Sequence, residues 1–296
     1  MDHRLIVTGA SEVYAASVLA LIGSIRCNWP AHPHIVVYDL GLSAGARDAI
    51  RRCGASVRDV AEFCPHWRQH FAWKIWAWND APCTNFLWID AGIVVLEPLD
   101  EIFERLSNEG LFVVPTYHLL SECASEQACE GVGVPPNFRN GRMTFAGGFI
   151  AFRREGRIAH VLADALRIAS VERFIASTHP RHRHDQMVIS LLIHRDLAGT
   201  CPADGLMYAG WTGPDQVPGQ KVWVHRRRLL WQDVEHLQRC AQSGGTRFVP
   251  TPLPQPSAWR TAWKAVFAPT ERVIRRLLRG QPLRADSVPY DGVRKR

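Results

Sequence analysis

The sequence lacks the features that mark several common classes of protein. No tyrosine is followed four residues later by a lysine, because the lysines are Lys74, Lys221, Lys264 and Lys295. None of the eight cysteines is paired at the close spacing of a zinc site. The longest weakly polar stretch, residues 13–25, is too short to span a bilayer. We therefore expect neither a short-chain dehydrogenase, nor a cysteine-bound zinc ion, nor a membrane span.

A second glycine is missing from the opening motif, in which the strand of residues 4–8 runs into the small-residue turn TGAS. A dinucleotide-binding turn needs glycines about four and six positions after the first, where the backbone approaches the pyrophosphate. Val13 and Ala15 stand there instead. The opening therefore predicts a strand, a turn and a helix over residues 12–27, but no dinucleotide fingerprint.

The composition points to a globular protein with anionic partners. The 296 residues are 47% hydrophobic, which is enough to bury a large core. The formal net charge of +7 favours anionic partners such as nucleotide phosphates, anionic lipid head groups or nucleic acid, without choosing among them. No cationic leader precedes the first strand, so we expect a cytoplasmic protein whose cysteines are free thiols.

Strand and helix patterns alternate along the chain, which predicts an α/β fold with a mostly parallel sheet. Strands are expected at residues 4–8, 34–39, 56–60, 85–90, 111–115, 143–154 and 221–225. Helices are expected at residues 12–27, 43–53, 71–78, 99–106, 157–170 and 186–194. Residues 118–140 are expected to form a long polar loop or short helix over a site. Gly147 and Gly148 interrupt a strand, where a ligand or another backbone comes close.

Two predicted strands end in a carboxylate, Asp39 after HIVVY and Asp90 after NFLWI. The carboxyl ends of parallel strands form the ligand-binding edge of an open α/β sheet. Two aspartates at that edge suit a nucleotide or metal site. The alternative is that Asp90 only caps the turn into Ala91 and Gly92.

The order of the motifs VTGASEVYAASVLALIGSI, HIVVYDLGLS, FAWKIW, FLWIDAGIVVLEPLDEIF, FAGGFIAFRR, HDQMVISLL and KVWVH resembles that of the nucleotide-sugar glycosyltransferases of GT-A fold. The resemblance is closest to the family 8-like retaining group and covers about residues 5–228. It implies a three-layer GT-A-like domain with a mixed, mostly parallel sheet. It also implies transfer of a hexosyl unit from a nucleotide sugar, uridine-linked by analogy, to a saccharide or lipid-linked acceptor, without a nucleic-acid partner.

The resemblance also assigns roles to individual residues. It implies a nucleotide site that contains Thr8, Gly9, Ala10, Tyr14, Asp39, Lys74 and Asp90. The donor sugar would rest on Ala91, Gly92, Gly147 and Gly148, with Asp185 and Gln186 as the catalytic pair. Structural alternatives remain open at this stage: Tyr14 as a core residue, Lys74 as a snorkelling surface lysine, and Asp185 as the cap of the helix that follows.

The metal site of the resembling family is only partly present. Family 8 enzymes carry Asp-x-Asp where this chain has Asp90, Ala91 and Gly92, so a Mn²⁺ or Mg²⁺ ion would lose one carboxylate ligand. His225 stands at the position of the family's histidine ligand, or is a polar strand-end residue. Arg226 follows directly, and a guanidinium can neutralise a diphosphate without a metal ion. The histidines in THPRHRHD have no further ligand at zinc spacing apart from Asp185, so we discount a zinc site there. Clustered His and Arg side chains in a loop are more often solvated or in contact with phosphate.

The domain organisation follows from these motifs. We expect one transferase domain over residues 1–235, with a nucleotide half (1–105) and an acceptor half (106–235). A proline-rich linker (236–256) and a basic, tryptophan-containing tail (257–296) follow. The tail is expected to lie on an anionic membrane surface, or else to close the back of the domain.

Two other functions fit the same sheet. A sugar nucleotidyltransferase should carry a basic, glycine-rich turn after the first strand, whereas TGASEVY has one glycine and no basic residue. A non-catalytic protein of this fold that binds a sugar nucleotide or a glycan is the other alternative, because Gly92 replaces the second aspartate.

Overall fold

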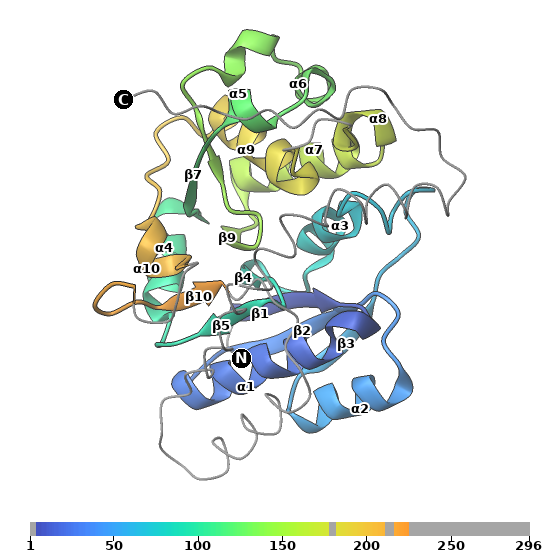
Figure 1. Ribbon diagram of the computed structural model, residues 1–296, viewed down its shortest axis with the longest axis vertical. Helices are drawn as coiled ribbons and strands as arrows, with labels where there is room; N and C mark the ends of the chain where they lie inside the picture. The colour runs from blue at the N-terminus through green and yellow to red at the C-terminus, as the bar shows by residue number, and fades with distance from the viewer. Residues whose placement is uncertain (1–3, 178–181, 211–215, 225–296) are drawn as a thin grey trace, which may run out of the picture. The chain divides into compact units, whose positions relative to one another are not determined.

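The computed structural model describes residues 4–177, 182–210 and 216–224 (Figure 1). The chain divides into two compact units, Met1–Pro250 and Thr251–Arg296, and all the described residues belong to the first. The predicted linker and tail lie outside the described residues. Within the described part of the chain, no helix is long and apolar enough to cross a membrane.

The central sheet has six strands in the order β3-β2-β1-β4-β9-β6. Its strands are β1 (Arg4–Ala10), β2 (His34–Asp39), β3 (Ser56–Asp59), β4 (Asn85–Ile89), β6 (Leu111–Phe112) and β9 (Phe149–Arg153). The first four are parallel to one another, and β9 is antiparallel to both of its neighbours. The predicted mixed, mostly parallel sheet is confirmed.

Helices cover both faces of the sheet, which gives three layers (Figure 1). One core contains residues of α1 (Ala15–Asn28), α2 (Ala44–Arg52) and α4 (Asp100–Glu109), and the other contains residues of α3 (Ala72–Asp80), α7 (Gly156–Ala169) and α9 (His184–Asp196). The central strands supply both cores, since Ile6 packs into the first and Val7 into the second. Strands buried on both faces read as continuous apolar runs, as RLIV and NFLWI do.

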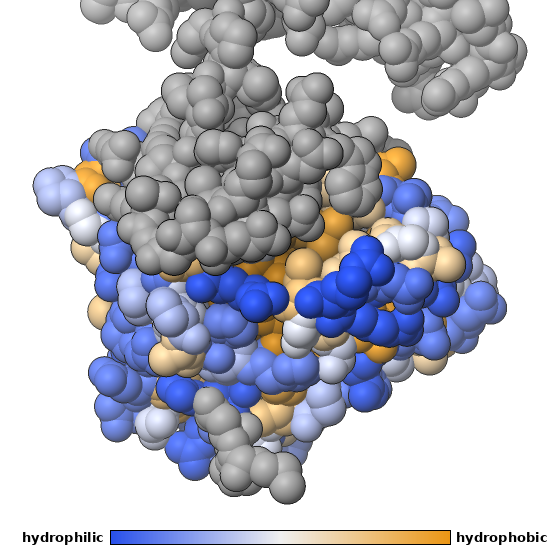
Figure 2. All heavy atoms as spheres, turned by 90° about the horizontal axis from the view of Figure 1, so that it is seen from below, coloured by the Kyte–Doolittle hydropathy of each residue, from blue (hydrophilic) through white to orange (hydrophobic). Residues whose placement is uncertain are grey.

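Two short strand pairs flank the sheet. β5 (Ile93–Val95) pairs antiparallel with β10 (Val222–Val224), and β7 (Pro115–Leu119) pairs antiparallel with β8 (Met143–Phe145). The remaining elements are η1 (Glu12–Tyr14), α5 (Leu120–Cys123), α6 (Glu126–Val132), η2 (Pro136–Arg139), α8 (Glu172–Ile175) and α10 (Gly205–Tyr208). The face of the molecule shown in Figure 2 is mostly hydrophilic, with apolar side chains gathered toward its centre.

Two segments show more detail than the sequence predicted. Residues 118–140, expected to form a long polar loop or short helix, contain the short helices α5, α6 and η2, and Ser125 caps α6 by accepting from the Ala128 N–H. The expected single strand over residues 143–154 is two strands in different sheets, β8 and β9. Gly147 and Gly148 lie at the break between them.

A salt bridge ties α7 to α9, the helix that carries Asp185. Arg195 Nη2 donates to Asp164 Oδ2 at 2.6 Å, and this hydrogen bond is the main cause that lowers the pKa of Asp164. A carboxyl group whose pKa is lower in the folded than in the unfolded protein stabilises the fold when the pH is above its unfolded pKa of about 4. This stabilisation is lost as the pH falls through the pKa of the folded state.

We therefore expect Asp164→Asn to lower the free energy of unfolding at pH 7 by no more than about 1 kcal/mol, because the pair is partly solvated. At a pH below the depressed pKa of Asp164 the two proteins should become equally stable. Urea unfolding at both pH values checks this, and a difference that persists at low pH would contradict it.

Candidate active site

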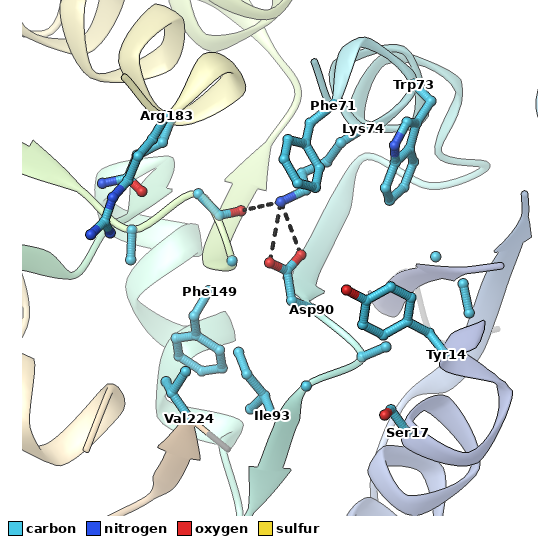
Figure 3. Close-up of a pocket in the computed structure, with 18 of the residues that line it drawn as sticks. Tyr14, Ser17, Phe71, Trp73, Lys74, Asp90, Ile93, Phe149, Arg183 and Val224 are labelled. Atoms are coloured by element: carbon cyan, nitrogen blue, oxygen red, sulfur yellow. Dashed lines mark hydrogen bonds and ion pairs between the residues drawn. The ribbon is translucent and has the colours of Figure 1, made fainter. Parts of the chain in front are cut away.

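A cavity of about 830 Å³ opens at the carboxyl ends of β1 and β4 (Figure 3). This is the sheet edge at which open α/β folds bind ligands. Its walls come from the turn after β1, the start of α1, the loop before α3, the turn after β4, the turn before β9 and the start of α9. The sequence-predicted residues that line it are Gly9, Ala10, Tyr14, Lys74, Asp90, Ala91, Gly92, Gly147, Gly148 and Gln186.

One side of the cavity is formed by the turn that follows β1. Tyr14 is 43% exposed and points into the cavity from the start of α1, so it is not a core residue (Figure 3). Gly9 touches the indole of Trp73, because a Cβ on Gly9 would lie 2.5 Å from Cζ3 of that ring. Thr8 is fully buried and does not line the cavity. The turn therefore presents Gly9, Ala10 and Tyr14, but not Thr8.

Asp39 lies outside the cavity lining although its strand ends at the same sheet edge. Its Oδ1 accepts hydrogen bonds from the backbone N–H groups of Gly41 and Leu42, each at 2.7 Å. Its Oδ2 pairs with Arg47 of α2 at 2.5 Å. The observed contacts of Asp39 therefore hold the turn between β2 and α2.

Lys74 and two carboxylates form the centre of the site. Lys74 Nζ lies 3.0 Å from Oδ1 and 3.2 Å from Oδ2 of Asp90 (Figure 3), and 3.0 Å from Oδ2 of Asp185. The carbonyl oxygen of Gly147 is 3.5 Å away. Lys74 is buried, so the snorkelling alternative is wrong.

The other contacts of Asp90 and Asp185 also exclude purely local roles. Asp90 Oδ1 accepts from Trp88 Nε1 at 2.7 Å, so its side chain does not cap the turn that follows β4. Arg183 precedes α9 as its N-cap, and no side-chain capping bond is made there. Asp185 therefore pairs with Lys74 and does not cap α9.

The charges in this cluster follow from burial and pairing. Burial alone would lower the pKa of Lys74, but the charges of Asp185 and Asp90 outweigh it and hold that pKa above its ordinary value. Burial raises the pKa of Asp185, and the ammonium of Lys74 opposes that rise. The Lys74 ammonium is also 5.3 Å from the ring centroid of Phe71, within cation–π range. Lys74 therefore stays protonated at neutral pH.

The two glycines before β9 make room for the carboxylates. A Cβ on Gly148 would lie 2.6 Å from Oδ2 of Asp90, and a Cβ on Gly147 would lie 2.8 Å from Oδ2 of Asp185. The Gly148 carbonyl also accepts the backbone N–H of Asp90 at 2.8 Å. The close approach that the sequence predicted here is therefore made by acidic side chains of the chain itself.

Asp185 and Gln186 occupy different positions. Asp185 is buried behind Lys74 and does not line the cavity, whereas Gln186 does. Gln186 Nε2 donates to Thr144 Oγ1 at 3.3 Å, and the Thr144 hydroxyl also bonds to that of Thr116. Gln186 is therefore the member of the pair placed to meet a ligand.

Several lining residues were missed by sequence reasoning. They are Ser11, Ser17, Leu40, Arg68, Phe71, Trp73, Ile93, Thr116, Arg183, Ala209 and Val224. Phe71 is 48% exposed and has a left-handed backbone with φ of 57°, which is uncommon for a bulky residue. Arg68 carries no local sequence signal, whereas Arg183 belongs to the basic segment THPRHRHD. His225 and Arg226 follow directly after β10 and lie outside the described residues.

The fold matches that of known glycosyltransferases. The galactosyltransferase LgtC, solved with donor and acceptor sugar analogues, aligns with a TM-score of 0.50 at 17% identity, over 87% of this chain and 99% of LgtC. The bifunctional glycosyltransferase WbbM aligns with a TM-score of 0.54 at 16% identity, over 82% of this chain and 50% of WbbM. GlyE of Streptococcus pneumoniae TIGR4 aligns with a TM-score of 0.52 at 13% identity, over 86% of this chain and 66% of GlyE.

No protein-family model matches the chain, and no curated protein matches its sequence. At these identities the structural matches establish the fold. The predicted GT-A-like glycosyltransferase fold is thereby confirmed.

Proposed function

We propose that the chain is a glycosyltransferase that moves a hexosyl unit from a nucleotide sugar, uridine-linked by the family resemblance, to a saccharide or lipid-linked acceptor. The observation that carries the proposal is the cluster of Lys74, Asp90 and Asp185 beside an open cavity at the ligand-binding edge of the sheet. The glycosyltransferase fold of the matching structures supports it.

The chemistry of glycosyl transfer makes two electrostatic demands. Negative charge grows on the departing nucleoside diphosphate, while the sugar carbon becomes cationic. Basic side chains must therefore face the phosphates, and oxygen atoms must face the sugar. The cavity offers both kinds of group, since Arg68 and Arg183 line it together with Asp90 and Gln186.

We assign the parts of the donor by position along the cavity. Tyr14 lies on one side of Asp90 and Arg183 on the other (Figure 3). The base stacks on Tyr14, and the sugar lies over the glycines before β9, next to Gln186. Asp185 acts through Lys74 as a positioning residue, because it does not reach the cavity surface. Retention of the anomeric configuration rests on the family resemblance.

The apolar side of the cavity suits an acceptor. Ile93, Phe149 and Val224 line it away from Tyr14 (Figure 3), and Ala209 also contributes. Aromatic and aliphatic surfaces of this kind contact the apolar face of a sugar ring or a lipid-linked unit. The proposed peripheral association with an anionic membrane rests on the sequence of the tail, residues 257–296.

Incubation with a panel of UDP-hexoses tests the function directly. We expect the protein to release UDP, by slow hydrolysis when acceptor is absent and faster with a suitable acceptor. A protein that binds UDP but releases none from any UDP-hexose would be the non-catalytic alternative. A protein that binds no nucleoside diphosphate would contradict both.

Tyr14→Ala should weaken UDP binding by about 5- to 150-fold, because stacking of a base on an aromatic ring contributes about 1–3 kcal/mol. Tyr14→Phe keeps the ring and should bind UDP nearly as the unchanged protein does. Isothermal titration calorimetry measures all three proteins. If the Ala and Phe variants bound UDP with equal affinity, the base would not stack on the ring of Tyr14.

A further inference from the structure

The family resemblance implies a divalent metal ion bound to Asp90. The side chains around Asp90 do not form a suitable set of ligands for such an ion. Both carboxylate oxygens lie within 3.2 Å of the Lys74 ammonium, and Oδ1 also accepts from the Trp88 indole. Gly92 stands where the family carries its second carboxylate. Among residues 4–177, 182–210 and 216–224, no group of three His, Cys, Asp or Glu side chains could hold a metal ion.

Lys74 itself has no capacity left to contact a phosphate. An ammonium has three N–H donors, and Lys74 is surrounded by Asp90, Asp185 and the Gly147 carbonyl. Its charge is therefore used within the protein, where it faces the two carboxylates. Divalent ions in such sites need several oxygen ligands, and this arrangement supplies a single carboxylate that is already paired.

The rest of the cavity has the charge that a diphosphate needs. Apart from Lys74 and Asp90, the described lining contains two basic side chains, Arg68 and Arg183, and no acidic one, which gives a formal charge of +2. Arg68 and Arg183 are both exposed, and within the described part of the chain neither forms a salt bridge with a carboxylate. Guanidinium groups bind phosphate oxygens in a bidentate manner.

We infer that the protein binds the diphosphate of its donor through its own basic side chains, Arg68 and Arg183, and requires no divalent metal ion. Asp90 serves as the partner of Lys74 in this scheme and not as a metal ligand. The inference rests on the proposed function, because it concerns the donor of that same site. The family resemblance, in contrast, implies an enzyme that depends on Mn²⁺ or Mg²⁺.

Calorimetric titration of UDP into the full-length protein, once in EDTA and once with excess Mn²⁺, tests the inference. We expect the two dissociation constants to agree within about 3-fold. Electron paramagnetic resonance of Mn²⁺ titrated with the protein alone should show no bound ion. Binding that requires Mn²⁺ would overturn this inference and leave the proposed function standing. Failure to bind UDP, GDP, ADP or TDP in either condition would overturn both.

A pair of double variants tests the arginines. Arg68→Gln with Arg183→Gln should weaken UDP binding in EDTA by more than about 10-fold, since charge-assisted hydrogen bonds are lost. Arg52→Gln with Arg157→Gln removes the same net charge from exposed positions outside the cavity and is the matched control. All four side chains are exposed, so the melting temperature should stay unchanged. Equal losses in the two double variants would overturn the assignment of Arg68 and Arg183.

Discussion

Replacing Lys74 by methionine is expected to lower the free energy of unfolding by about 3–5 kcal/mol and to reduce glycosyl transfer at least about 100-fold. The variant leaves Asp185 buried without its partner and leaves both oxygens of Asp90 without the ammonium that positions them. An uncompensated buried charge is costly, and a displacement of about 1 Å in an active site is enough for such a loss of rate. Urea unfolding and UDP release from a UDP-hexose measure the two effects.

A double variant separates charge balance from catalysis. Lys74→Met with Asp185→Asn removes the buried charge of Asp185, so it should recover part of the lost stability while transfer stays low. Lys74→Arg keeps the positive charge and should lose less stability than Lys74→Met. A methionine variant as stable and as active as the unchanged protein would show that the cluster has neither role.

Gly148→Ala is expected to reduce transfer by at least about 100-fold and to cost about 1–3 kcal/mol of stability. The added Cβ would lie 2.6 Å from Oδ2 and 3.1 Å from Cγ of Asp90, which Lys74 and Trp88 hold in place. The backbone of Gly148 is not in the left-handed region, so alanine meets no conformational barrier there. The effect therefore tests the position of the Asp90 carboxylate.

Gly45→Ala is the matched control for that substitution. Gly45 lies in α2, and a Cβ there would have nothing within 4 Å. Alanine in a helix is favoured over glycine by about 0.5–1 kcal/mol, so this variant should be slightly more stable and fully active. An active Gly148→Ala protein would contradict the close approach of Asp90 to the β9 turn.

The architecture was predictable because it depends on local patterns. The parallel strands β1, β2 and β4 are continuous apolar runs, and each is bounded by small or acidic residues that end it. The cap of α2 was predictable too, since Ser43 Oγ accepts from the Ala46 N–H at 3.2 Å. Such signals act within a few residues and do not depend on the rest of the chain.

The site was predictable only in part, because the same local pattern serves two purposes. Asp39 and Asp90 both follow apolar parallel strands, yet Asp39 holds a turn and pairs with Arg47, whereas Asp90 faces the cavity. The sequence around Lys74 was equally compatible with a surface position. Its burial depends on Asp90, which follows β4, and on Asp185 of α9, which lies far away in the sequence. Only the tertiary arrangement decides between such alternatives.

A crystal structure of the protein with a UDP-hexose in EDTA would show the donor in place. We expect the base to lie against Tyr14, the diphosphate next to Arg68 and Arg183, and the sugar over Gly147 and Gly148. A nucleotide bound outside this cavity, or a diphosphate that contacts neither Arg68 nor Arg183, would rule out this site for the donor.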